Sequence, residues 1–475
     1  MTVGTTEAHT MKSNVPFMLL CTIGLTFAVL MLASGLQVLD PMIRHDDFGA
    51  LLADPTDFYV KTLEEGRWLN YWWHLRGWVT PAWINFSVYQ FFWAVFAGAA
   101  AVNACGKEEP FRYVAALALM IVVSLPALLI SVWFNTLLPG LGLVALFALL
   151  ASFLRPATMR WLLLLFVPLI LMAYTTFPLL LLTVCLTTRD LRRSWWDLLT
   201  LMATFVISFA LGLFVIYSLN YMEHGVFGIS IANWRNPTSP HDLASVIANL
   251  GLVLEFFKET ALTIAFENTT MVTIFVLVLT GSLIYLARVE PWTALYIFAG
   301  LFAGIGLLSL QIIMTGVITP ARAVNFVWVL YSVLCVRVAV VCHSKGRVPA
   351  NLAWSFLLIT ITVYLIWIWE RYFIYTYWQD ETRALAVQAG SGAGPIYVIG
   401  SYKALKSESK VGIMGPRGLQ LRLKYLTGRT VFVCDKTPDA CENVSADALS
   451  GLVVPVPEVR QMQDRTEIIL PPVTE

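Results

Sequence analysis

Long apolar segments separated by short polar ones run along the chain from residue 16 to residue 370. A helix of about 20 apolar residues is long enough to cross a bilayer, so this alternation predicts an all-α protein that spans a membrane many times. Two segments, Trp161 to Tyr174 and Pro178 to Thr187, are short and close together, and they are either two shallow helices or one broken crossing. The pattern contains eleven segments in all: Pro16 to Leu36, Pro81 to Ala104, Tyr113 to Phe134, Gly140 to Leu154, Trp161 to Tyr174, Pro178 to Thr187, Leu198 to Asn220, Thr269 to Ala287, Pro291 to Thr315, Val324 to Cys342 and Leu352 to Glu370.

The composition agrees with this pattern. The chain of 475 residues is 58% hydrophobic and 13% charged, with a mean hydropathy of +0.73, whereas charged residues make up about 25% of an ordinary soluble protein. The formal net charge is only +1, which provides no whole-molecule attraction to nucleic acid. The expected class is a polytopic membrane protein without a nucleic-acid partner.

The basic residues predict the orientation in the membrane. Residues 1–14 are polar and carry Lys12, and the apolar segment after them is longer than the ~7 to 15 residues of a secretory signal, so we expect a signal anchor with the N-terminus inside. With eleven crossings every inside loop is basic, as the positive-inside rule requires, and the C-terminus is outside. Ten crossings would put the run Arg189 to Arg193 outside. The cations of the inside loops are Lys107, Arg112, Arg155, Arg160, Arg189, Arg192, Arg193, Arg288, Lys345 and Arg347.

Three of the predicted outer segments are long or polar enough to hold a site: Asp40 to Thr80, Tyr221 to Asn268, and Gly316 to Arg322. In the second of them, Ser239 to Leu262 has apolar residues at helical spacing, with Ser239 placed to cap the helix and Pro240 suited to its first turn. This pattern predicts a helix that lies on the membrane surface.

The composition changes after Tyr372, where charged residues return and a linker rich in Gly, Ala and Ser follows at Ala389 to Pro395. Alternating apolar and polar residues then predict short strands. We therefore expect a membrane domain over 1–375, with its outer loop at 37–80, and a small, mostly β extracytoplasmic domain over 376–475. The strand candidates are Pro395 to Gly400, Leu419 to Tyr425, Thr430 to Cys434 and Thr466 to Leu470.

Two of the seven cysteines, Cys434 and Cys441, lie in this outer domain and flank a turn. A pair at hairpin spacing in an oxidising compartment predicts a disulfide, with two free thiols as the alternative. The other five cysteines fall in or beside apolar segments, and no Cys/His spacing indicates a zinc site.

The candidate chemistry follows the first apolar segment, where Arg44, His45, Asp46 and Asp47 are consecutive at a membrane boundary. An Asp-Asp pair alone is compatible with solvated loop acids or helix caps. The neighbouring cations and the aromatic residues that follow favour a chemical role, because charges mixed with Trp and Tyr are typical of an interfacial segment. These aromatic residues are Trp68, Tyr71, Trp72, Trp73 and Trp78.

An acidic pair on an outer loop, an interfacial aromatic segment and a many-helix body resemble the GT-C superfamily of membrane glycosyltransferases. Within it, Asp46-Asp47 followed by Gly66-Arg67-Trp68-Leu69 is similar to the bacterial O-antigen glucosyltransferases of the Gtr serotype-conversion family. The resemblance covers roughly residues 15–375. It implies a polyprenyl-phosphate sugar donor, with glucose or a close relative as the sugar, and a lipopolysaccharide or other surface glycan as acceptor. It also implies inversion at the anomeric carbon, and a bacterial inner membrane with the C-terminal domain in the periplasm.

Sugar transfer from a lipid phosphate to a hydroxyl needs a base for the hydroxyl proton and cationic or N–H donors for the phosphate. Asp46 is the expected base and Asp47 the supporting acid, since neighbouring residues of a helix point in different directions. Two close carboxylates also raise each other's proton affinity, which predicts a base with a pKa nearer neutral. A divalent metal stays open, because acidic pairs of this kind work with or without an ion. The candidate donor or acceptor contacts are Arg44, His45, Arg67, His74, Arg235, His241 and Arg322.

Three of these contacts have a simpler alternative, since Arg322 can extend to lipid headgroups and Arg235 or His241 can anchor the chain at the interface. Two other functions compete with sugar transfer. A transporter or flippase of lipid-linked sugar would need ionisable residues within the spans, and these are nearly absent apart from Arg337. A membrane scaffold that presents the outer domain to a partner would leave Asp46 and Asp47 without a role.

Overall fold

The computed structural model describes residues 15–106, 108–189, 193–390, 392, 394–412, 414–441, 444 and 456–473. The polar residues 1–14, with Lys12, which precede the expected signal anchor, lie outside these ranges. The loop cations Lys107 and Arg192, and residues 391 and 393 of the predicted linker, also lie outside them.

The described part of the chain is a multi-pass helical membrane protein. Eight of the described helices are long and apolar enough to cross a bilayer, and there is a ninth span if the bent pair α6 (Phe111–Val122) and α7 (Leu125–Ser131) is counted as one. Two shorter apolar helices are α9 (Pro156–Leu171) and α10 (Phe177–Thr187). The helical membrane fold is thus confirmed, while the count of eleven crossings stays a prediction. Among the described residues, the eight long apolar helices are α1 (Val15–Ala33), α5 (Ala82–Cys105), α8 (Phe134–Ala151), α11 (Trp195–His224), α13 (Thr269–Val289), α14 (Pro291–Thr315), α15 (Asn325–Lys345) and α16 (Arg347–Ala389).

The break between α6 and α7 has a local cause. The two helices meet at 54°. Ser124 lies between them in an extended conformation and its side chain accepts a hydrogen bond from the backbone N–H of Ala127, which caps α7. Pro126 follows in the first turn of α7, where its missing N–H costs nothing because that group has no partner within a helix. A new helix therefore starts here instead of continuing α6.

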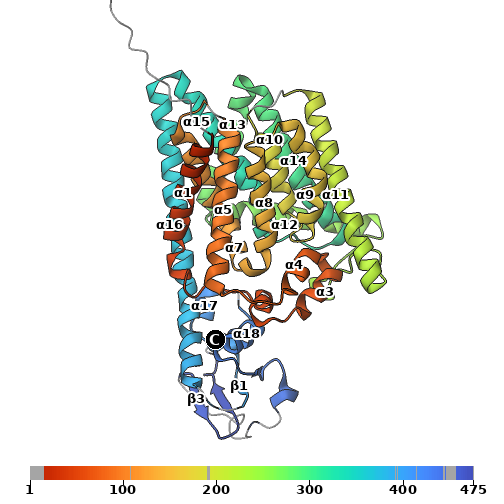
Figure 1. Ribbon diagram of the computed structural model, residues 1–475, viewed down its shortest axis with the longest axis vertical. Coiled ribbons are helices and arrows are strands. Elements are labelled where there is room, and N and C mark those ends of the chain that lie inside the picture. Colours follow the sequence, from red (N-terminus) through yellow and green to blue (C-terminus); the bar gives the residue numbers. More distant parts are fainter. Residues whose placement is uncertain are drawn as a thin grey trace, which may run out of the picture.

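Helix α16 connects the membrane bundle to the extramembrane domain (Figure 1). It has 43 residues, and at about 1.5 Å per residue such a helix is roughly twice as long as the ~30 Å bilayer core. The domain boundary predicted after residue 375 falls inside this helix.

The short helices α2 (Gly49–Leu52), α3 (Thr56–Glu65) and α4 (Trp68–His74) lie at the same end of the bundle as the extramembrane domain (Figure 1). The surface helix predicted from Ser239 is α12 (Leu243–Ile264), and its cap is Asp242 instead. Asp242 and Ser245 form a reciprocal capping box, which satisfies two N–H groups where Ser239 would satisfy one. The outward face of α12 exposes Leu243, Ile247, Leu250, Leu254 and Phe257.

The extramembrane domain contains a four-stranded sheet in the order β2-β1-β4-β3. Its strands are β1 (Ile396–Ile399), β2 (Val431–Val433), β3 (Glu458–Gln461) and β4 (Thr466–Ile469). Strand β1 is parallel to β2 and to β4, and β3 is antiparallel to β4. Near β2, Cys434 and Cys441 form a disulfide.

The strand predicted at Leu419 to Tyr425 is wrong, because these residues belong to α18 (Pro416–Thr427), which follows the short α17 (Glu408–Val411). Parallel strands need a long crossover connection that is usually helical, and α18 lies between the parallel strands β1 and β2. Leu419 and Leu423 are four residues apart and both are buried, which is the helical period. The domain is thus a mixture of helices and strands.

Candidate functional site

The loop after α1 is fixed at both ends, which determines where Asp46 and Asp47 point. The buried Gln37 accepts a hydrogen bond from the backbone N–H of Met42 at 2.9 Å, and the backbone N–H of Arg44 donates to the carbonyl of Val132 at 3.0 Å. A short 3-10 helix, His45–Asp47, follows directly. Its tight turn directs the two carboxylates to different sides.

Asp46 faces a cavity of about 630 Å³ at the outer-loop end of the bundle. The walls come from α3, from the junction of α7 and α8, from the turn between α9 and α10, from other loops at this end of the bundle and from the extramembrane domain. Segments from across the sequence therefore surround Asp46. The lining residues are Arg44, His45, Asp46, Asp57, Val60, Lys61, Glu64, Glu65, Arg67, Ile130, Trp133, Leu137, Tyr174, Trp234, Arg235, Arg322 and Arg417.

Both oxygens of Asp46 accept a hydrogen bond. The Trp133 indole N–H donates to Oδ1 at 2.6 Å, and the Lys61 ammonium forms an ion pair with Oδ2. Burial alone would raise the pKa of Asp46, but the charges of Lys61 and His45 and these hydrogen bonds outweigh it and hold the pKa well below its usual range. The prediction of a pKa shifted toward neutral is thus wrong for Asp46, since its immediate neighbour in space is a cation.

Asp47 points away from the cavity and is completely buried. Its Oδ2 accepts from the backbone N–H and the side-chain amide of Asn135 at 3.0 and 2.8 Å, and its Oδ1 accepts from the backbone N–H of Thr136 at 2.7 Å. These are N–H groups of the first turn of α8, which have no partner within the helix. Burial raises the pKa of Asp47 to about 7, while the hydrogen bonds from Thr136 and Asn135 oppose this shift. Asp47 thus caps α8 from a distant part of the chain.

Arg44 and Arg322 lie on the Trp133 ring, with their guanidinium carbons 5.8 and 4.4 Å from the ring centre. Within the described ranges neither arginine has an ion pair with a carboxylate, and the buried Nε of Arg44 has no hydrogen-bond partner. Two cations without counter-ions beside a cavity form a site for an anion, and a planar guanidinium is suited to a phosphate.

Arg67 and Arg235 also line the cavity, but their charges are already matched. Each forms an ion pair with a different oxygen of Glu65. The guanidinium carbon of Arg67 lies 5.3 Å from the ring centre of Tyr174. Both arginines line the cavity, but their ion pairs with Glu65 make them less available to a ligand than Arg322.

The three predicted histidines lie in different environments. His45 is at the cavity, and burial lowers its pKa. His74 is outside the cavity lining and buried behind α3, where Nε2 is 3.1 Å from the hydroxyl of Thr136 and the ring packs 4.1 Å from that of Phe58. Burial lowers the pKa of His74 to about 3. His241 is exposed in the loop before α12 and is not part of the lining.

Sequence reasoning missed three residues of this site: Lys61, Trp133 and Arg417. Lys61 had a signal, because Asp57, Lys61 and Glu64 are spaced to share one face of a helix. Trp133 ends an apolar segment, where nothing in the sequence links it to Asp46. Arg417 pairs with Asp57 across a separation of 360 residues.

Among the residues that the structure describes, no group of three or more His, Cys, Asp or Glu side chains could hold a metal ion. Asp46 already has Lys61 as its counter-ion.

Comparison of the chain with protein families, curated proteins and solved structures found no match.

Proposed function

We propose that this protein is an inverting glycosyltransferase that moves a sugar, with glucose as the first candidate, from a polyprenyl-phosphate donor to a lipopolysaccharide or other surface glycan. The observation that carries the proposal is one cavity that combines an ionised carboxylate, Asp46, with two unpaired arginines, Arg44 and Arg322. Sugar transfer from a lipid phosphate needs a proton acceptor and a cationic phosphate site within reach of one sugar ring.

In the proposed reaction the acceptor hydroxyl oxygen attacks the anomeric carbon and its proton goes to Asp46. The bond from that carbon to the phosphate oxygen breaks, and polyprenyl phosphate leaves with both bonding electrons. A carboxylate has about four lone-pair positions, and Trp133 and Lys61 each occupy one on Asp46. Positions for the acceptor hydroxyl therefore remain.

The low pKa of Asp46 is compatible with this role. A carboxylate of low pKa is a weak base toward a free hydroxyl, but it is ionised at every physiological pH. The hydroxyl becomes strongly acidic as its oxygen bonds to the anomeric carbon, so a weak base suffices once bond formation has begun.

Arg44 and Arg322 would hold the donor phosphate and stabilise the charge that develops as it leaves. Trp133 contacts both arginines and also Asp46. The indole would thereby set the distance between the base and the leaving phosphate. A single displacement, which inverts the anomeric carbon, would place the sugar between Asp46 and the phosphate held by the two arginines.

For the membrane, we infer eleven crossings in a bacterial inner membrane, with the extramembrane domain in the periplasm. Contacts of the short helices support the count: the backbone N–H of Leu69 donates to Met172 after α9 at 3.1 Å, and that of Arg189 after α10 donates to Asn103 of α5 at 2.9 Å. A reporter that is active only outside the cytoplasm should work after residue 375 and fail after Arg193. Activity after Arg193 would contradict the inferred topology.

The arrangement of ionisable groups supports transfer over transport. Arg337 was the exception expected within a span, and it pairs with Glu290 between α13 and α14 and with Glu109 between α5 and α6. The enzymatic proposal is tested with purified protein and polyprenyl-phosphate glucose. Release or transfer of glucose is the expected result. Movement of intact lipid-linked sugar across vesicles without any glucose release would contradict it.

A further inference from the structure

The extramembrane domain reaches the cavity through the side chain of Arg417, the second residue of α18. One nitrogen of its guanidinium, Nη2, contacts both carboxylate oxygens of Asp57 on α3, and both residues line the cavity. The side chains are 42% and 31% exposed, so a ligand can reach the pair. Nη1 and Nε of Arg417 have no partner among the described residues. Arg417 of the extramembrane domain thus has N–H groups available for hydrogen bonds at the cavity wall.

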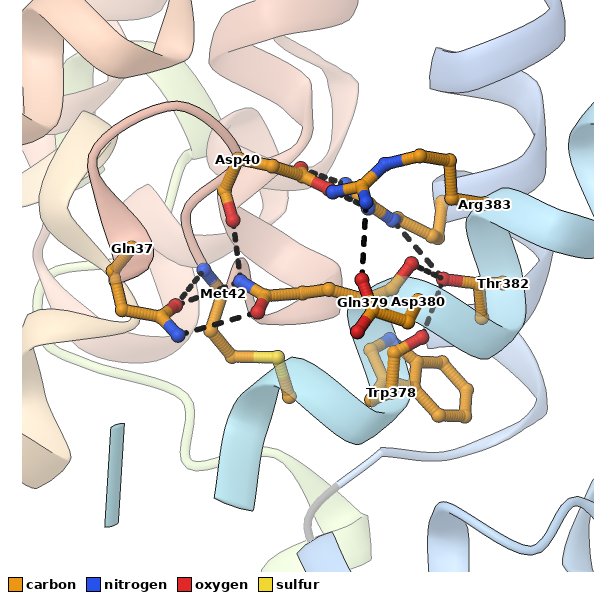
Figure 2. A network of polar contacts seen from close by, with 9 residues as sticks. Gln37, Asp40, Met42, Trp378, Gln379, Asp380, Thr382 and Arg383 are labelled. Carbon is orange, nitrogen blue, oxygen red and sulfur yellow. Dashed lines mark hydrogen bonds and ion pairs between the residues drawn. The ribbon is translucent and has the colours of Figure 1, made fainter. Parts of the chain in front are cut away.

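Helix α18 is held in place by Asp40, so the position of Arg417 is fixed. Arg422 of α18, with a side chain only 3% exposed, donates to the two oxygens of Asp40 at 2.7 and 2.5 Å. Figure 2 shows Arg383 and Gln379 of α16 converging on Asp40. Burial alone would raise the pKa of Asp40, but Arg422 and Arg383 lower it, so Asp40 is ionised at neutral pH and these contacts persist.

Lys61 connects the Asp57–Arg417 pair to Asp46. Asp57 and Lys61 are four residues apart on α3, so their side chains are neighbours on one face, about 5 to 6 Å apart at Cβ. Lys61 binds one oxygen of Asp46, and Trp133, which carries the unpaired arginines, binds the other. The Asp57–Arg417 pair therefore neighbours Lys61 at Oδ2 of Asp46, whereas Arg44 and Arg322 contact Trp133, which binds Oδ1.

We propose that the Asp57–Arg417 pair holds the acceptor sugar by two neighbouring hydroxyls, so that a third hydroxyl meets Asp46. This inference rests on the proposed function and names the acceptor side of the same cavity. A sugar hydroxyl both donates and accepts hydrogen bonds, and a carboxylate beside a guanidinium with free N–H groups offers an acceptor and a donor side by side. Asp57 and Arg417 compensate each other's charge, so the pair offers no net charge to an acidic sugar and is suited to a neutral one.

Binding of simple glycosides tests the proposal without requiring turnover. Full-length protein in detergent is titrated with neutral methyl hexosides and with a methyl hexuronide, and binding is followed by ligand-observed NMR. Neutral hexosides should bind the wild type, and Arg417→Ala should weaken them about tenfold or more, as expected when hydrogen bonds to a charged group are lost. The matched control is Arg460→Ala, an arginine of the same domain that pairs with Glu458 outside the cavity and should change nothing.

Three results would overturn the proposal: no binding of neutral hexosides to the wild type, equal binding to Arg417→Ala, or a preference for the hexuronide. Thermal unfolding of Arg417→Ala and Arg417→Lys shows whether either variant has lost its fold, and Arg417→Lys, which keeps the charge, must retain part of the binding. Donor hydrolysis without glycoside should be unchanged in the control variant Arg460→Ala, which lies outside the cavity. If the wild type binds hexosides through Arg417 but hydrolyses no polyprenyl-phosphate glucose, this sugar site stands and the proposed function fails.

Discussion

Asp47 provides a quantitative test of how the outer loop is fixed to the membrane bundle. Asp47→Ala removes the acceptor for three N–H groups of Asn135 and Thr136 in the fully buried first turn of α8. A buried donor without a partner costs ~1 to 3 kcal/mol, so after local relaxation the variant should lose roughly 3 to 5 kcal/mol of folding free energy. Asp47→Asn should lose less folding free energy, because its amide oxygen still accepts hydrogen bonds at one of the two oxygen positions. Its NH2 group, at the other position, would face an N–H donor and form no bond.

The assay is thermal unfolding of the purified protein in detergent, followed by tryptophan fluorescence. The apparent Tm of Asp47→Ala should fall by roughly 5 °C or more. The matched control is Asp54→Ala in the same loop, since Asp54 is exposed and accepts one backbone N–H, from Thr56 at 3.1 Å. Loss of such a cap costs ~0.5 to 2 kcal/mol, typically ~1. Equal Tm values for Asp47→Ala and Asp54→Ala would refute the assignment of Asp47 as the cap of α8.

Two further predictions concern charge at the cavity and at the domain junction. Arg322→Lys keeps the charge but loses the planar fork, so the KM for polyprenyl-phosphate sugar should rise by about tenfold while kcat changes less, and an unchanged KM would exclude Arg322 from the phosphate site. Burial raises the pKa of Glu408 to about 7, against the opposing charge of Arg44. The folded pKa lies above the ordinary value, so the stability contributed by Glu408 is complete below about pH 4.5 and is lost as the pH rises through about 7. Glu408→Gln should therefore flatten the pH dependence of thermal unfolding between pH 5 and 8, and an unchanged slope would show that Glu408 does not titrate there.

The apolar pattern predicted the helical membrane body because a bilayer requires long apolar helices and few other solutions. The pattern did not predict α18, since a period of two in Leu419, Leu421 and Leu423 fits a strand until the parallel pairing of β1 and β2 requires a helix between them. Local periodicity carries no information about which strands will pair. Tertiary context therefore decided this element.

The candidate site was likewise predicted only in part from the sequence. Asp46 and Asp47 were identified from their position after the first crossing, and their different directions follow from helical geometry. Lys61 and Trp133, which set the protonation state of Asp46, lie 15 and 87 residues away in sequence. A pKa depends on neighbours in space, so the prediction based on the adjacent Asp47 had the wrong sign.

In the proposed reaction Asp46 accepts the proton of the acceptor hydroxyl. Asp46→Asn keeps the size of the side chain and its hydrogen bond from Trp133 but removes proton acceptance. Transfer of glucose from polyprenyl-phosphate glucose should fall by ~10²-fold or more in kcat, with little change in donor KM, while Asp54→Asn behaves as the wild type. Near-normal turnover by Asp46→Asn would contradict the claim, and His45 would then be the next base to examine.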